Sequence, residues 1–305
     1  MTATLEFHGV SKWYGQVSAL TEVDLCCGPG VTGLVGQNGA GKSTLMKLAA
    51  GLLNPSTGEV SLCGERPTRR AARSVLGYCP DIDRFYEEMS GRNFVAWMLR
   101  LDGMTARAAK ARAGEVLDEL GLGEAMHRRI GGYSKGMRQR VKLAQALGKR
   151  PSVLLLDEPL TGLDPVARHE VTQVVRGIGQ SGVCVLVSSH VLHELQNFAD
   201  AGVALIHQGR LLAHGAVAEL RAQMGERPHR LRLRSEHPRE LASRLAALDV
   251  VASVSVGDDD VRIETRAVAG AFAELTRVGA SARGLITELQ PLDDDLEAVF
   301  GYLVS

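Results

Sequence analysis

The stretch GQNGAGKST, residues 36–44, contains the residue types that hold a phosphate group. Its glycines leave backbone N–H groups free to close around phosphate oxygens, and the helix expected after the loop offers its positive end to the same charge. In loops of this form the lysine, here Lys42, meets the β and γ phosphates, and the hydroxyl of Ser43 meets Mg²⁺. We therefore expect a phosphate site here, with an ordinary strand-to-helix turn as the alternative.

A pair of adjacent carboxylates, Asp157 and Glu158, follows the apolar run VLLL. Such a run predicts a buried strand that delivers Asp157 to its carboxyl end, where ligands of open α/β sheets bind. Because Mg²⁺ requires a carboxylate beside the hydroxyl, we expect Asp157 to bind the metal together with Ser43. Glu158 should point to the opposite side along the strand and polarise the water that attacks the γ phosphate.

The elements that must position these groups can be read from apolar runs. VLLLD (153–157), VCVLVSS (183–189) and VALIH (203–207) are separated by helical stretches, which is typical of a buried parallel sheet. Strand-like runs alternate with turn residues between 5 and 64, and VTGLVG leads directly into the glycine loop. A helical insert, with Ser90 and Thr105 as N-caps, is expected at about 85–150. The prediction is an α/β nucleotide-binding domain at 1–225 with a parallel core, an antiparallel β subdomain and this insert.

Residues 226–305 have a different pattern and predict a small α+β accessory domain. The expected order is β-α-β-β-α-β, as in a ferredoxin-like unit, with a last helix after Pro291. Arg230, Arg232 and Arg234 alternate along the first strand and thus share one of its faces. That face either binds an acidic ligand that regulates the chain or is simply solvated.

The composition limits the function classes. The chain has 305 residues, 45% of them hydrophobic, so it can bury a large core. Lys+Arg and Asp+Glu both total 35, which gives no global field favouring nucleic acid or an anionic membrane. The five cysteines form no CxxC pair, so neither a disulfide framework nor a zinc site is indicated. We find no signal peptide and no apolar stretch of membrane-spanning length, so work at a membrane would require a partner.

The segment YSKGMRQR (133–140), placed before LLLDEP (154–159), resembles the signature motif of ATP-binding cassette (ABC) ATPases. The resemblance covers about residues 5–220 and implies ATP and Mg²⁺ as cofactors. It also implies that Ser134 and Gly136 face the γ phosphate of ATP held by an opposite subunit, as suits the N–H groups that open a helix. Such a site needs a nucleotide-dependent homodimer.

Other motifs follow in the order of the family. Tyr14 in KWYG resembles the residue that stacks on adenine, Asp164 in LTGLDP resembles the one that communicates across the dimer, and His190 resembles the histidine that contacts the γ phosphate. The candidate catalytic residues are then Glu158 and His190. The candidate nucleotide-binding residues are Tyr14, Gly36, Asn38, Gly39, Ala40, Gly41, Lys42, Ser43, Thr44, Ser134, Gly136 and Asp164, and the candidate metal ligands are Ser43, Asp157 and Asp81.

Two motifs depart from the family pattern. GYCPD (77–81) places Asp81 where the family usually has glutamine; aspartate can ligate Mg²⁺ but adds a negative charge and lacks an amide donor. We expect a functional site with altered metal or hydrolysis behaviour. The signature has Lys135 and Met137 where many members carry glycine and glutamine. Lys135 either faces solvent or adds positive charge near the partner's γ phosphate.

The resemblance is strongest to the ATPase of ABC-2 type exporters, given the single cassette, the signature form and the carboxy-terminal segment DDDLEAVF (293–300). It implies a peripheral protein on the cytoplasmic face of the membrane, held by separate permease subunits, with no nucleic-acid partner. The alternative is a soluble ABC ATPase acting on ribosomes or nucleic acid. Those relatives usually carry two cassettes in one chain or zinc cysteines, and their partners call for a basic surface.

Overall fold

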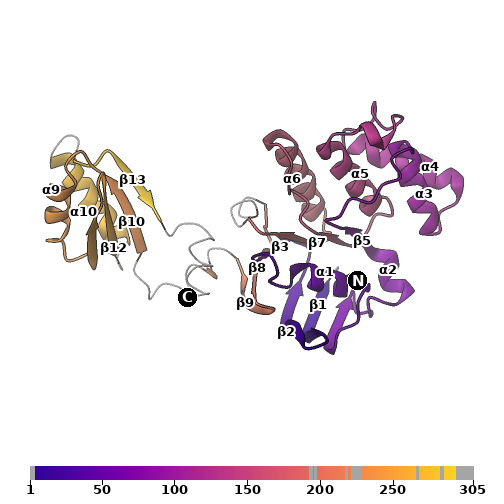
Figure 1. Ribbon diagram of the computed structural model, residues 1–305, viewed down its shortest axis with the longest axis horizontal. Coiled ribbons are helices and arrows are strands. Elements are labelled where there is room, and N and C mark those ends of the chain that lie inside the picture. Colours follow the sequence, from indigo (N-terminus) through magenta and orange to yellow (C-terminus); the bar gives the residue numbers. More distant parts are fainter. Residues whose placement is uncertain are drawn as a thin grey trace. The chain divides into compact units, whose positions relative to one another are not determined.

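The computed structural model describes residues 4–191, 195, 198–216, 219–220, 229–265, 268–281 and 285–292. The chain divides into two compact units, residues 1–216 and 217–305 (Figure 1). The domain boundary expected near residue 225 falls outside the described residues. Each unit has its own β-structure, and the two units are described separately below.

A six-stranded sheet forms the centre of the first unit, in the order β5-β6-β7-β3-β8-β9. All neighbours are parallel except β8 and β9, which pair antiparallel at one edge. The apolar runs explain this arrangement, since β3, β6 and β7 are buried along their whole length. The predicted parallel core is confirmed. Its strands are β3 (Gly30–Val35), β5 (Leu76–Cys79), β6 (Val153–Leu156), β7 (Cys184–Ser189), β8 (Gly202–His207) and β9 (Arg210–Gly215).

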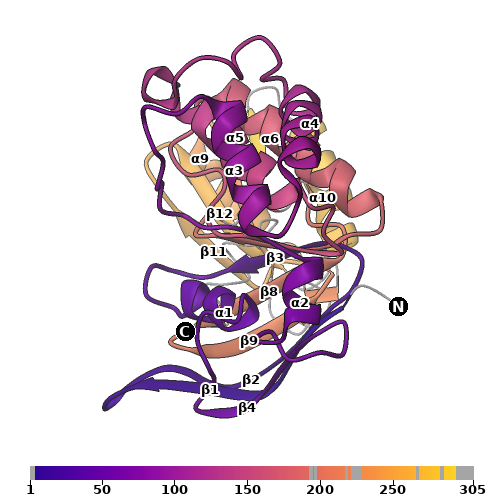
Figure 2. The same cartoon turned by 90° about the vertical axis from the view of Figure 1, so that its right-hand side faces the viewer.

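A second, antiparallel sheet has the order β2-β1-β4, and helix α1 lies between it and the six-stranded sheet (Figures 1 and 2). One hydrophobic cluster joins the three layers: Phe7 from the antiparallel sheet, Leu45 and Met46 from α1, and Leu186 from the parallel sheet. Because α1 packs against a sheet on each side, the position of its first turn is fixed. The end of the glycine loop, which leads into that turn, is fixed with it. The elements are β1 (Leu5–Tyr14), β2 (Val17–Cys27), β4 (Thr57–Leu62) and α1 (Lys42–Ala49).

The predicted helical insert is present, and its first two helices begin where the sequence indicates. The Ser90 hydroxyl accepts from the N–H of Asn93 at 3.3 Å, and the Thr105 hydroxyl accepts from the N–H of Ala108 at 3.3 Å. The helices α3, α4 and α5 group together on the side of the sheet away from β1 and β2 (Figure 2). The bounds are α3 (Gly91–Leu101), α4 (Ala106–Glu119), a 3-10 turn η1 (Ile130–Gly132) and α5 (Lys135–Leu147); outside the insert lie α2 (Arg70–Val75) and α6 (Pro165–Gln180).

The second unit contains a four-stranded antiparallel sheet in the order β11-β12-β10-β13, with the element order β-α-β-β-α-β. Leu231, Leu233 and Ile263 lie in its own hydrophobic core. On the opposite face the arginines meet carboxylates: Arg230 is 3.3 Å from Glu264, Arg232 2.5 Å from Asp260 and Arg234 3.5 Å from Glu288. The helix expected after Pro291 lies outside the described residues. The bounds are β10 (His229–Arg234), α9 (Pro238–Leu245), β11 (Ser253–Val256), β12 (Asp260–Thr265), α10 (Val268–Ser281) and β13 (Glu288–Pro291).

Candidate active site

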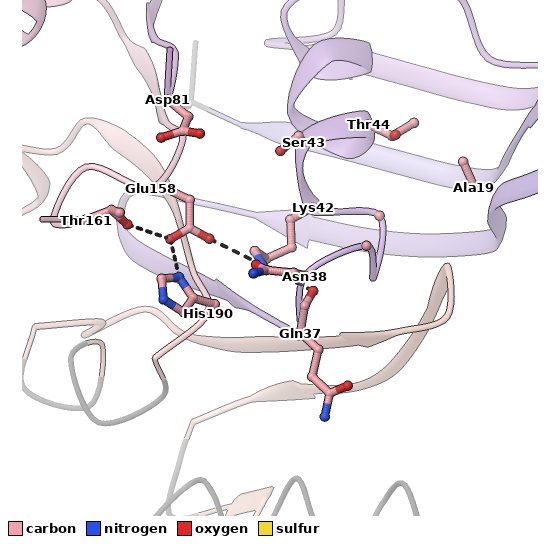
Figure 3. A pocket seen from close by; sticks show the side chains of 12 residues that line it. Ala19, Gln37, Asn38, Lys42, Ser43, Thr44, Asp81, Glu158, Thr161 and His190 are labelled. Atoms are coloured by element: carbon pink, nitrogen blue, oxygen red, sulfur yellow. Dashed lines mark hydrogen bonds and ion pairs between the residues drawn. The ribbon is translucent and has the colours of Figure 1, made fainter. Parts of the chain in front are cut away.

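A cavity of about 370 Å³ opens at the carboxyl end of the parallel sheet, over the loop between β3 and α1 (Figure 3). It is built from the glycine loop, the loop after β5 and the segments that follow β6 and β7, which are distant in sequence. The lining residues are Ala19, Gln37, Asn38, Gly39, Gly41, Lys42, Ser43, Thr44, Asp81, Glu158, Thr161 and His190.

The glycine loop has a backbone that only glycine adopts readily. Gly39 and Gly41 have φ values of 83° and 109°, and Gly41 is the N-cap of α1. A side chain at Gly36 would overlap the backbone carbonyl of Ile206 on β8. The loop therefore packs closely on the sheet, while its residues and the start of α1 line the cavity, where a phosphate would meet the helix N-terminus.

Lys42 lies inside this loop, with only 6% of its surface exposed. Its Nζ donates to the carbonyl of Gly36 at 2.7 Å and lies 3.3 Å from Oε1 of Glu158. The lysine thus brings positive charge to the cavity, where it contacts the carboxylate of Glu158.

Glu158 is held at three points. Its Oε2 lies 2.8 Å from Nδ1 of His190 and accepts from the hydroxyl of Thr161 at 3.1 Å, and its Oε1 contacts Lys42 (Figure 3). Burial raises the pKa of Glu158, but the hydrogen bond to His190 and the charge of Lys42 outweigh it and hold the pKa below its usual value. Glu158 is therefore ionised at neutral pH.

We expected Asp157 and Glu158 to point to opposite sides because residues alternate along a strand. The structure directs the two side chains apart in another way. Strand β6 ends at Leu156, and Glu158 has φ 49°, in the left-handed region that costs a non-glycine residue free energy. The N–H of Glu158 donates to the hydroxyl of Ser188 at 2.9 Å, which helps to hold this turn. The chain turns here so that the Glu158 side chain lines the cavity.

Asp157 is 97% buried beneath the cavity, and the Ser188 hydroxyl donates to its Oδ1 at 2.6 Å. Burial raises the pKa of Asp157, hydrogen bonds from Ser188 and Ser43 lower it, and the negative charges of Asp81 and Glu158 raise it, so that it stays above its usual value. A cation would relieve that cost. The oxygens of Ser43, Asp157 and Asp81 are the hard donors that Mg²⁺ prefers, and the site fits this metal.

Several predicted residues do not line this chain's cavity. Tyr14 is 47% exposed at the end of β1, with the Lys12 ammonium 5.6 Å from the centre of its ring. Ser134 caps α5 by accepting from the N–H of Met137 at 3.3 Å, and Asp164 caps α6 by accepting from the N–H of Ala167 at 2.9 Å. Gly36, Ala40, Gly136 and Asp157 are also absent from the lining.

Lys135 lies across Gly162 in the loop that follows Glu158, so that a side chain at Gly162 would overlap it. It is exposed in this chain, as both expectations for Lys135 require. The signature segment and the loop carrying Thr161 are thus in contact within this chain.

Three cavity residues were missed by sequence reasoning: Ala19, Gln37 and Thr161. Gln37 belongs to the glycine loop itself, and its position there was the available signal. Thr161 is a hydroxyl three residues after Glu158 in a short loop, and this spacing permits the hydrogen bond that forms. Ala19 comes from β2, and nothing in its local sequence marks it.

A phosphate loop between a parallel strand and a helix, with carboxylates arriving from the next strands, defines a P-loop nucleoside triphosphatase. The family described as ABC transporter matches residues 20–161 of the chain. The daunorubicin/doxorubicin resistance ATP-binding protein DrrA of Streptomyces peucetius is 34% identical over 99% of this chain and 93% of that protein. The chain therefore belongs to the ATP-binding proteins of ABC transporters, and it binds ATP and is an ATPase of that class.

Other relatives agree. A Nod factor export ATP-binding protein I of Burkholderia orbicola is 36% identical over 70% of this chain and 71% of its own length. Among solved structures, an ATP binding subunit of an ABC transporter has a TM-score of 0.65 at 28% identity, covering 72% of this chain and 93% of the other. Among the residues that the structure describes, no helix has the length and apolar character needed to cross a membrane.

Proposed function

We propose that this chain is the ATP-hydrolysing subunit of an ABC-2 type exporter and drives separate transmembrane permease subunits. The contact of Glu158 with both His190 and Lys42, in the ATP cavity, is the observation that carries the proposal. It supports ATP hydrolysis because an ionised carboxylate beside the glycine-loop lysine can orient a water molecule. Relatives named for drug resistance and Nod factor export support the exporter assignment.

The roles of the residues follow from their chemistry. Loop N–H groups and Lys42 hold the β and γ phosphates, while Ser43, Asp157 and Asp81 hold Mg²⁺, which supplies neutralising charge on those phosphates when bound. Glu158 accepts a hydrogen bond from the attacking water and orients it. His190 keeps the Glu158 carboxylate in place and extends toward the γ phosphate.

A head-to-tail homodimer accounts for the residues that lie outside the cavity. Ser134 and Asp164 stand at exposed helix N-termini, where free N–H groups favour an anion or a polar partner. We propose that Ser134 and Gly136 bind the γ phosphate of the partner's ATP, that Asp164 contacts the partner, and that Tyr14 stacks on adenine. Closing on ATP and opening after hydrolysis would then move the permease.

The proposed location is the cytoplasmic face of the membrane, where the permease would hold the chain. The soluble alternative, an ATPase acting on ribosomes or nucleic acid, receives no support from the relatives named above. The transported substrate would be selected by the permease.

The test uses a tagged Glu158→Gln variant purified from solubilised membranes with ATP and Mg²⁺. Loss of the general base should slow hydrolysis by at least about 100-fold and leave the ATP-bound form for capture. Recovery of a polytopic membrane protein in stoichiometric amount would support the exporter. Recovery with ribosomes or DNA from the soluble fraction would overturn it, and unchanged hydrolysis would remove Glu158 from its role.

A further inference from the structure

Helix α5 buries a lysine whose three donors are all used by one loop. Lys142 is 7% exposed, and its Nζ donates to the carbonyl of Pro80 at 3.2 Å and to the carbonyl of Asp81 at 3.0 Å. The same Nζ lies 2.7 Å from Oδ1 of Asp83. An ammonium has three N–H donors, so these acceptors satisfy it completely and Asp83 balances its charge.

A second polar side chain on the same helix face continues the attachment. Gln139, three residues earlier and 6% exposed, has its Nε2 3.5 Å from Sγ of Cys79. Burial raises the pKa of Cys79 to about 12, so this sulfur is a neutral thiol. Residues separated by three lie on one side of a helix, so α5 holds the chain from Cys79 to Asp83 with consecutive turns.

The loop held in this way carries Asp81 into the ATP cavity. Asp81 lines the cavity together with Ser43 and Glu158, and Figure 3 shows its carboxylate on the side of Ser43. On the other side of the loop, the N–H of Asp157 donates to the carbonyl of Cys79 at 2.9 Å. The backbone of Asp157 and the loop of Asp81 are therefore joined at Cys79, and beyond this bond Lys142 contacts the loop at Pro80, Asp81 and Asp83.

We propose that Lys142 is a positioning residue for the Mg²⁺ end of the ATP site, fixing the backbone of residues 80–83 to α5 so that Asp81 faces the metal. This inference rests on the proposed function, since it assigns Asp81 to the metal. Lys142 would also connect α5, whose N-cap is the signature residue Ser134, to the loop of the proposed metal site by direct bonds.

The test compares Lys142→Met with the unchanged protein. Met keeps the length and apolar stem but removes all three donors, so the loop loses its anchor. The Mg²⁺ concentration for half-maximal ATP hydrolysis should rise about tenfold, as for other groups that orient a metal ligand. Amide hydrogen exchange at Asp157, whose N–H donates to the carbonyl of Cys79 at the start of the loop, should quicken in the nucleotide-free protein, and Lys142→Arg should restore both properties at least in part.

Lys149 offers a matched control. It follows the same helix and makes the same kinds of bond, donating to the carbonyl of Arg73 at 2.9 Å and to Asp102 at 3.4 Å, but neither residue that it holds lines the ATP cavity. Lys149→Met removes a comparable clamp. It should leave the Mg²⁺ dependence and the hydrogen exchange of the Asp157 amide unchanged.

A second variant keeps the inference falsifiable if Lys142→Met does not fold. Asp83→Asn removes the ion pair from its partly exposed side, and should shift the Mg²⁺ requirement in the same direction by a smaller factor. Wild-type Mg²⁺ dependence and exchange in the Lys142 variant, or in Asp83→Asn if only that folds, would overturn the inference. So would an equal shift in Lys149→Met. Absence of hydrolysis by the unchanged protein would instead refute the proposed function, and the exchange measurement would still decide whether Lys142 holds the loop.

Discussion

At the scale of single residues, two adjacent carboxylates have opposite electrostatic environments. Asp157 is buried, and its pKa lies above the usual value, whereas Glu158 meets His190 and Lys42, and its pKa lies below it. An acid with a raised folded pKa destabilises the fold at neutral pH, and one with a lowered folded pKa stabilises it. Replacing either carboxylate by its neutral amide should therefore change the stability of the fold, but in opposite directions.

For Asp157→Asn we expect a higher Tm than wild type in the nucleotide-free protein at pH 7. Asn removes the buried charge and still accepts from Ser188, and the gain should shrink as pH falls through the raised pKa of Asp157. ATP hydrolysis should fall by at least about tenfold because the proposed Mg²⁺ ligand is weakened. Thermal melts between pH 3 and 8 test this, and a lower Tm at pH 7 would contradict it.

For Glu158→Gln we expect the opposite change in Tm. The ionised carboxylate gains from Lys42 and His190, and this stability is fully present above the unfolded pKa and lost as pH falls through the lower folded pKa. The variant should have a lower Tm than wild type at pH 7, with the difference closing toward acid pH. The same melts check it, and a Tm gain at pH 7 would show that burial dominates the pKa of Glu158.

At the scale of elements, N-caps allow a comparison between a structural and a functional hydroxyl. Thr105 caps α4 and Ser134 caps α5 with hydrogen bonds of equal length, 3.3 Å. Each alanine variant should lose about 1 kcal/mol of unfolding free energy. Only Ser134→Ala should also lose ATP-dependent dimerisation, measured by size-exclusion chromatography in the Glu158→Gln background. Equal dimerisation by both variants would remove Ser134 from the partner's ATP site.

Locally encoded elements were predicted from the sequence. Ser90 and Thr105 mark helix starts because an N-cap bond spans only three residues, and the apolar runs mark buried strands because burial on both faces needs no alternation. Contacts between distant segments were not predictable. The left-handed turn at Glu158 depends on Ser188, and the attachment of Lys142 depends on a loop about sixty residues away in the chain.

At the scale of the whole molecule, the ATP cavity belongs to the first unit alone. Its lining residues fall between Ala19 and His190, and the large hydrophobic cluster of that unit draws on residues 5–206 and Leu211. Among the described residues, the second unit has a hydrophobic core of its own, built from residues of that unit. ATP binding should therefore not depend on the second unit.

Removing residues 229–305 tests this directly. We expect the truncated chain to bind a fluorescent ATP analogue with the affinity of the full chain, since both the phosphate loop and its supporting core remain. Lost binding in a truncated chain with a native far-UV circular dichroism spectrum would contradict that expectation. The ATP hydrolysis rate and the recovery with membranes are then compared between the truncated and the full chain. This comparison tests the role of the arginine face of β10, whose arginines are already paired with carboxylates. A changed hydrolysis rate at equal ATP affinity would indicate that the second unit regulates the ATPase. An unchanged rate and an unchanged recovery would indicate that the arginine face is simply solvated.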